Sequence, residues 1–188
     1  MPKRIAVTGG PGGGKTTVWR ALSAAHCDRV LAVPEVATLM FRHVFPQVEN
    51  EAERCAVQRA IFKVQNELEA FYAARALPGQ TLLCDRGSCD GGGYWPEGHT
   101  AFFAAMGSSW EQELARYDAV LFLETAAVGG YSIREGNETR TETLAEAVHV
   151  DTRLRQVWEQ HPRFVHIAHE RDFAQKLTRA EAALSALL

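Results

Sequence analysis

The stretch G-G-P-G-G-G-K-T-T at residues 9–17 follows a short, mostly apolar run, Arg4–Thr8, and leads into a helical pattern, Lys15–Ala25. Glycine tolerates the backbone angles that let successive N–H groups turn inward around an anion. A helix that begins at the end of such a loop adds the partial positive charge of its N-terminus. The stretch therefore predicts a strand, a phosphate-wrapping loop and a helix, in that order.

This loop fits the motif G-x-x-x-x-G-K-[ST], with Gly9, Gly14, Lys15 and Thr16 at the defining positions. We predict that it binds a nucleoside triphosphate, with Lys15 reaching the β- and γ-phosphates and the Thr16 hydroxyl ligating Mg²⁺. The expected cofactor is Mg²⁺ with ATP, and GTP is an open alternative. The predicted nucleotide-binding residues are Gly9, Gly10, Pro11, Gly12, Gly13, Gly14, Lys15, Thr16 and Thr17.

Short apolar runs alternate with longer helical patterns along the rest of the chain. The expected strands are Arg4–Thr8, Val30–Val33, Thr81–Cys84, Ala119–Leu123 and Phe164–Ile167. The expected helices are Lys15–Ala25, Val36–His43, Glu51–Ala76, Trp110–Arg116, Leu144–Gln160 and Arg171–Leu187. Apolar strands in regular alternation with helices indicate a parallel sheet covered on both faces. We therefore predict an α/β fold, a three-layer P-loop NTPase with a five-stranded parallel sheet, similar to nucleotide kinases.

Length and composition narrow the class of protein. A chain of 188 residues fits one domain, residues 1–188. The formal net charge of −3 gives no reason to expect a nucleic-acid partner. The four cysteines show no metal-ligand spacing, and no apolar run suits a signal peptide or a membrane span, so we expect a cytoplasmic protein. Apolar residues on the helix Glu51–Ala76 suit a core or a dimer interface equally, which leaves an oligomer possible.

Three charged side chains follow strands whose carboxyl ends meet the edge that holds the glycine-rich loop. Asp85 and Arg86 follow the third expected strand, and Glu35 follows the second. We predict that Asp85 joins Thr16 as a ligand of Mg²⁺, and that Arg86 clamps a phosphate or an acceptor. Glu35 suits a general base or a ligand of the acceptor hydroxyl. An Asp–Arg capping pair and a helix-terminal acid are the structural alternatives.

Two glycine-containing stretches interrupt the pattern. Gly87–Gly98 is expected to be an irregular loop that either covers an acceptor or is packed down by its aromatic residues. The segment at about 129–142 is predicted to be a lid, whose Arg134 and Arg140 neutralise charge on the transferred phosphoryl group. A solvated surface loop is the alternative for that segment.

The long helix Glu51–Ala76 is polar on part of its face. Its side chains could contact an acceptor, although most are expected at the surface; they are Gln58, Arg59, Lys63, Gln65 and Asn66. Phe62, Phe71 and Trp158 are expected in the core.

Four stretches, taken in their order and spacing, resemble a known family. They are GGPGGGKTT (9–17), PEVATLM (34–40), LLCDRGSCDGGGYW (82–95) and TRTETLAEAVHVDTRLRQVW (139–158). The set is similar to the AAA-type ATPase-like family shared by the NadR ribosylnicotinamide kinase domain and the TRP-channel translocation-defect nucleotide-binding proteins. The resemblance implies triphosphate and Mg²⁺ at Gly14–Thr17, a reaction centre at Asp85 and Arg86, Glu35 near the acceptor, and Arg134 with Arg140 in the lid.

Three functions stay open at this point. We favour a small-molecule kinase that transfers the γ-phosphate of ATP to a hydroxyl of a nucleoside-like acceptor. A nucleotide-dependent binding or regulatory module is the first alternative, and a simple NTPase is the second. A regulatory GTPase is disfavoured, because no Asn/Thr-Lys-x-Asp element follows the strands Ala119–Leu123 and Phe164–Ile167.

Overall fold

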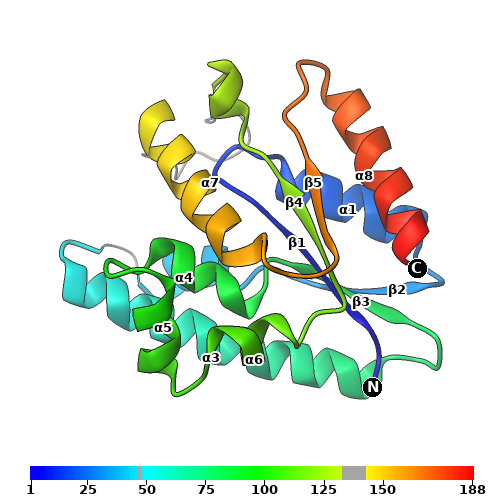
Figure 1. The fold of residues 1–188 in the computed structure, drawn as a ribbon. Helices are drawn as coiled ribbons and strands as arrows, with labels where there is room; N and C mark the ends of the chain where they lie inside the picture. The colour runs from blue at the N-terminus through cyan, green and yellow to red at the C-terminus, as the bar shows by residue number, and fades with distance from the viewer. Residues whose placement is uncertain (46–47, 133–142) are drawn as a thin grey trace.

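A computed structural model describes residues 1–45, 48–132 and 143–188. The described residues form a parallel five-stranded sheet in the order β2-β3-β1-β4-β5, with helices on both faces (Figure 1). The strands are β1 Arg4–Thr8, β2 Val30–Val33, β3 Thr81–Asp85, β4 Ala119–Leu123 and β5 Phe164–Ile167. This arrangement confirms the predicted three-layer α/β P-loop NTPase fold.

Alternate residues of the central strands supply two separate hydrophobic cores, because successive side chains of a strand point to opposite faces. On one face, Val7 and Leu121 pack with α1 Lys15–Ala25 and α8 Phe173–Leu187. On the other face, Ala6 and Phe122 belong to a larger core that includes aromatic side chains of the covering helices. Burial on both faces explains why these strands are apolar throughout in the sequence.

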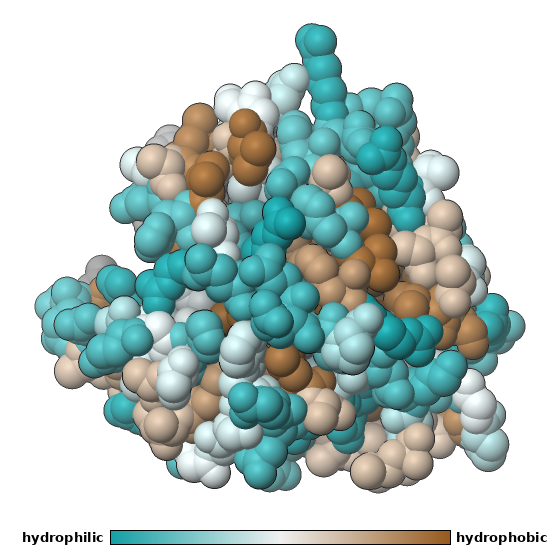
Figure 2. All heavy atoms as spheres, in the orientation of Figure 1, coloured by the Kyte–Doolittle hydropathy of each residue, from teal (hydrophilic) through white to brown (hydrophobic). Residues whose placement is uncertain are grey.

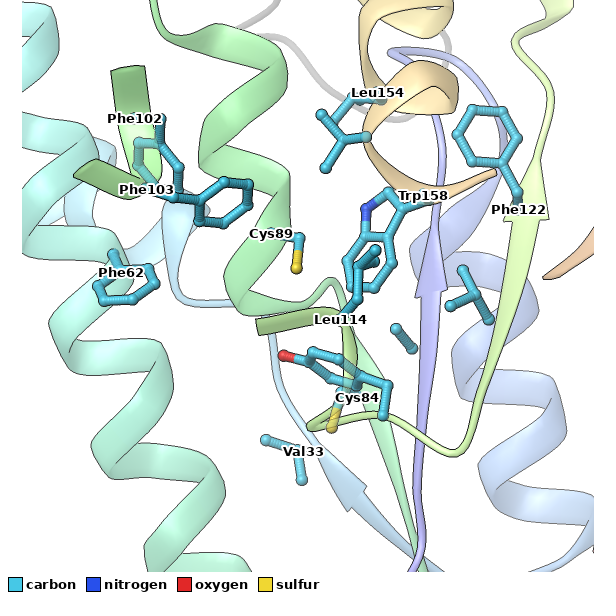
Figure 3. Close-up of a cluster of buried hydrophobic side chains, with 14 of the residues drawn as sticks. Val33, Phe62, Cys84, Cys89, Phe102, Phe103, Leu114, Phe122, Leu154 and Trp158 are labelled. Atoms are coloured by element: carbon cyan, nitrogen blue, oxygen red, sulfur yellow. The ribbon is translucent and has the colours of Figure 1, made fainter. Parts of the chain in front are cut away.

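The larger core is covered by elements from the middle of the chain and by α7. They are α3 Glu51–Arg75, the 3₁₀ turn η1 Ser88–Asp90, α4 Gly91–Tyr94, α5 His99–Met106, α6 Trp110–Leu114 and α7 Leu144–Trp158. Two short elements, α2 Ala37–His43 and η2 Ala126–Gly129, lie outside this core. In Figure 3, Leu154 and Trp158 of α7 point toward the segment that carries Cys89, while Phe62 of α3 and Phe102 of α5 lie on its other side. The exterior seen in Figure 2 mixes hydrophilic and apolar groups without one continuous apolar surface.

The structure corrects several sequence-based expectations. Gly87–Gly98 is not an open irregular loop: it contains η1 and α4, and α5, which the sequence reading missed, begins directly after it. Phe71 is 55% exposed and does not belong to the core, whereas Phe62 and Trp158 do. Helix ends differ by one or two residues, which is usual for frayed termini. No helix within the described ranges has both the length and the apolar character needed to cross a membrane.

Candidate functional site

The glycine-rich loop lies between the end of β1 and the start of α1, as its sequence predicts. Gly12 and Gly14 have positive φ angles of 77° and 79°, so this turn requires glycine. A Cβ atom on Gly13 would lie 2.5 Å from the carbonyl oxygen of Leu123, the last residue of β4. The loop is therefore packed tightly against the neighbouring strand end, and α1 begins directly after Gly14.

A buried aspartate of α7 fixes the back of this loop. One carboxylate oxygen of Asp151 accepts hydrogen bonds from the backbone N–H groups of Gly10, at 2.8 Å, and Thr125, at 2.9 Å. A Cβ atom on Gly10 would lie 2.4 Å from the same oxygen, so glycine is needed for this approach. The Thr125 hydroxyl donates to the carbonyl of Pro11. These contacts tie the loop to β4 and α7.

A second buried lysine lies behind the loop. Lys176 of α8 is only 2% exposed, and its ammonium group donates to the carbonyl of Glu124 at 2.6 Å. Burial lowers the pKa of Lys176 to about 8, against the opposing effect of the Asp151, Glu124 and Glu170 carboxylates. Neither Asp151 nor Lys176 was predicted from the sequence, because no local motif marks them.

Lys15, in the first turn of α1, is 5% exposed, and its ammonium group donates to the carbonyl of Gly10 at 2.6 Å. The lysine side chain thus folds back over the loop that precedes it. Its positive charge acts to lower the pKa values of both Glu35 and Asp85, so the three charged groups interact with one another. Thr16 follows Lys15, and its hydroxyl acts to lower the pKa of the nearby Asp85 carboxylate.

Asp85 ends β3, which pairs directly with β1, so the carboxylate lies beside the glycine-rich loop. The residue is 1% exposed, and its Oδ1 atom has no hydrogen-bond partner among the described residues. Burial, followed by the charge of Glu35, raises the pKa of Asp85 to about 6, against the opposing charges of Arg86 and Lys15. A buried carboxylate oxygen without a partner, next to a threonine hydroxyl, is a donor set that fits Mg²⁺.

Glu35 lies across from Asp85, beyond the end of β2, and both of its oxygens are held. Arg86 donates to Oε1 at 2.5 Å, and Thr38 donates to Oε2 at 2.6 Å. Burial alone would raise the pKa of Glu35, but the Arg86 charge and these hydrogen bonds outweigh it and lower the pKa below its ordinary value. Glu35 is therefore ionised at neutral pH.

Arg86 bridges two carboxylates. In addition to Glu35, its guanidinium donates to Asp90 of η1 at 3.0 Å, and it lies 6.0 Å from the ring centre of Tyr94. Asp90 also accepts hydrogen bonds from Thr8 of β1 and Trp158 of α7. Arg86 adopts φ of 73°, an uncommon angle for a residue other than glycine, and this turn aims its side chain back across the strand ends.

The glycine-rich loop, Glu35, Asp85 and Arg86 line one cleft of about 1730 Å³ at the carboxyl ends of the strands. The structure thus brings together the predicted site residues that it describes. Arg134, Arg140 and most of the predicted lid lie outside the described residues. No group of three or more His, Cys, Asp or Glu side chains in the described part of the chain is placed to hold a metal by itself. Thr16 and Asp85 would need phosphate oxygens to complete a magnesium site.

Of the two roles expected for Gly87–Gly98, the structure fits the packed one, because Trp95 is 5% exposed and its ring lies edge-on to Phe102, with ring centres 5.5 Å apart. Gly91, Gly92 and Gly93 are buried, and a Cβ atom on Gly93 would lie 2.6 Å from Leu154 of α7. The triple glycine therefore allows α4 to pack closely against α7 and is not a flexible cover. Asp90, at the start of this segment, is the functional candidate that the sequence reading missed there.

A glycine-rich loop of this sequence, at a strand–helix junction and beside the buried Asp85 carboxylate, defines a P-loop nucleotide-binding protein. The family model of the AAA domain matches residues 4–176, so the chain belongs to the AAA domain family. No curated protein matches the chain.

Proposed function

We propose that this protein is a small-molecule kinase that transfers the γ-phosphate of ATP to a hydroxyl group of a nucleoside-like acceptor. The proposal is carried by one observation: two carboxylates with opposite pKa shifts lie at adjacent strand ends beside the glycine-rich loop. Such divergent environments suit two different tasks in one reaction. The sequence also resembles the NadR ribosylnicotinamide kinase domain, so ribosylnicotinamide is one acceptor to test.

On the nucleotide side, backbone N–H groups of residues 9–14 and the Lys15 ammonium would hold the phosphates. Thr16 and Asp85 would hold Mg²⁺, which supplies charge neutralisation for the transferring phosphoryl group. Asp151 holds Gly10 from behind through a 2.8 Å hydrogen bond and so keeps the loop in its wrapped shape. Catalysis by this set consists of positioning and electrostatic stabilisation.

On the acceptor side, ionised Glu35 would accept the proton of the attacking hydroxyl. The acceptor oxygen forms a bond to the γ-phosphorus, the bond from that phosphorus to the β–γ bridging oxygen breaks, and ADP leaves. Arg86 keeps Glu35 in place through the 2.5 Å contact and adds positive charge near the transferred group. Arg134 and Arg140 remain the proposed lid arginines.

The test is ADP release by the purified chain with Mg²⁺ and ATP, with and without pooled nucleosides, ribosylnicotinamide, mononucleotides and inositol lipids. We expect one pool to stimulate release. Lys15→Ala should reduce the stimulated rate by at least about 10²-fold, the loss typical of one strong charge-stabilising donor. Asp28→Asn, at an exposed position in the turn after α1, serves as the control substitution.

Two other outcomes would refute the kinase proposal. Tight nucleotide binding without acceptor-stimulated release would indicate a nucleotide-dependent binding module. Full-rate release without any acceptor would indicate an NTPase. An unchanged rate in Lys15→Ala would show that the glycine-rich loop is not the reactive site.

A further inference from the structure

One face of α3 is turned toward the cleft. The α3 residues that line the cleft are Arg54, Gln58, Ile61, Phe62 and Gln65. Their spacing of three, four and seven positions places them on one stripe of the helix. Because α3 packs against β2, η1 and α4, this stripe lies on the side of the cleft formed by these elements. It forms one wall of the cleft that the glycine-rich loop also lines.

Gln58 is the exceptional residue on this wall. It is 6% exposed, yet among the described residues its side-chain amide has no hydrogen-bond partner. Neither amide atom is sealed off as a fully buried, unpaired atom, so the amide keeps contact with the cleft. A buried amide without a partner is unfavourable, and native proteins usually satisfy such groups with a ligand, water or another side chain.

The second buried glutamine on the same stripe shows the contrast. Gln65, two turns further along α3, donates to the fully buried Glu69 at 3.0 Å. Glu69 also accepts hydrogen bonds from Tyr117, at 2.7 Å, and Arg116, at 3.1 Å. Gln65 therefore belongs to a satisfied internal network behind the cleft wall. Gln58 is also buried on α3, but it lines the cleft and has no such partner among the described residues.

Aromatic side chains stand beside this amide. Phe62 follows Gln58 by one helical turn and packs edge-on against Phe102, with ring centres 5.6 Å apart. Tyr94 of α4 lines the same cleft, and the Arg86 guanidinium lies 6.0 Å from its ring centre. A flat ring entering the cleft would find apolar and aromatic walls, with one amide to satisfy its polar edge.

We infer that Gln58 is a specificity residue that pairs with an amide-type edge of the acceptor, meaning a hydrogen-bond donor and acceptor side by side on a planar ring. A glutamine amide offers one carbonyl acceptor and an NH₂ donor, and pairs in this bidentate way with nucleobase edges. The inference rests on the proposed function, since it names the acceptor class. Nucleobases and ring carboxamides share this edge, and a sugar or an inositol does not have it.

The experiment measures binding separately from phosphoryl transfer. The full chain, saturated with Mg²⁺ and the non-hydrolysable analogue AMPPNP, is titrated calorimetrically with uridine, cytidine, adenosine, guanosine and ribosylnicotinamide. Methyl β-D-ribofuranoside, which has the sugar hydroxyls but no ring edge, is the reference probe. The variants are Gln58→Leu, Gln58→Glu and the exposed control Gln156→Leu on α7.

We expect at least one base-bearing riboside to bind on the order of 10-fold to 100-fold more tightly than the methyl riboside, the range for one satisfied buried polar pair. Gln58→Leu should remove this difference in affinity. Gln58→Glu should also remove it for a ligand whose ring acceptor would then lie against the new carboxylate, because two acceptors repel each other. AMPPNP affinity should be unchanged in both, which shows that the fold is intact. Gln156→Leu should bind like the wild type. If a nucleoside binds most tightly, the recognised edge belongs to a nucleobase; if ribosylnicotinamide binds most tightly, it belongs to a ring carboxamide.

The inference is overturned if no base-bearing riboside binds, if the methyl riboside binds equally well, or if Gln58→Leu leaves the preference intact. Phosphoryl transfer from ATP, measured on the same probes, decides the proposed function independently. Binding that depends on Gln58 without transfer refutes the kinase and leaves the recognition role standing. Equal transfer to methyl riboside and base-bearing ribosides refutes the recognition role and leaves the kinase standing.

Discussion

Replacing Asp85 with asparagine should stabilise the nucleotide-free protein. Burial and the nearby Glu35 charge raise the pKa of Asp85 from 3.8 to about 6. The native state therefore binds this proton more tightly than the unfolded chain does, and ionisation at neutral pH opposes folding. A shift of about two units at about 1.36 kcal/mol each corresponds to roughly 3 kcal/mol at pH 7. The neutral asparagine avoids this penalty.

The pH dependence gives the sign of the effect. The favourable contribution of protonated Asp85 is complete below the unfolded pKa of 3.8 and is lost as the pH rises through about 6. The advantage of Asp85→Asn should therefore be about 3 kcal/mol at pH 7, fall to about half of that at pH 5, and be below about 1 kcal/mol at pH 4. For a chain of this size the gain at pH 7 corresponds to a Tm increase of roughly 6–12 °C.

The assay is urea unfolding at pH 4, 5 and 7, with Asp28→Asn as an exposed control that should show no such trend. A second arm adds ATP with Mg²⁺ or with EDTA. The wild type should gain more from Mg²⁺ than Asp85→Asn does, because only the carboxylate offers a charged metal ligand. Equal or lower stability of Asp85→Asn at pH 7, or a gain independent of pH, would refute the electrostatic reasoning.

Two further substitutions test the packing and the charge network. Gly93→Ala should lower the free energy of unfolding by about 1–3 kcal/mol, because the new methyl group would lie 2.6 Å from Leu154. If urea unfolding finds this variant as stable as the wild type, α4 does not pack closely on α7. Arg86→Lys should slow acceptor-stimulated turnover roughly 10–100-fold with little change in nucleotide affinity, since one ammonium cannot reproduce the fork between Glu35 and Asp90. A large loss of AMPPNP affinity instead would place Arg86 on the nucleotide.

The sequence could predict the features that rest on local patterns. Apolar strands, the helix after each strand and the glycine-rich loop all follow from short-range rules, so the fold and its strand positions were predictable. Glu35 and Asp85 could be placed at the strand ends because parallel strands share one carboxyl edge. The pKa shifts of Glu35 and Asp85 could not be predicted from the sequence, because they depend on burial and on which side chains face each other.

The remaining features are set by contacts between distant residues. Asp151 is separated from Gly10 by 141 positions, and no local signal connects a helix aspartate to a loop amide. The stretch that holds Gly91–Gly93 was expected to be an irregular loop because its composition is rich in glycine, whereas tertiary packing against Leu154 makes it a short helix. Phe71 was expected in the core from its residue type, but it lies on the outer side of a long helix.

Glu35 and Asp85 differ in how far their negative charges are compensated in the nucleotide-free protein. The negative charge of Glu35 is compensated by Arg86, and Thr38 holds its second oxygen. Asp85 keeps an unpaired oxygen and a raised pKa, and is the group whose charge is least compensated. A bound cation would lower that pKa and turn the cost of the buried charge into binding energy for Mg²⁺ and nucleotide. The same residue should therefore weaken the nucleotide-free fold and strengthen the loaded one, and for this reason Asp85→Asn separates stability from function.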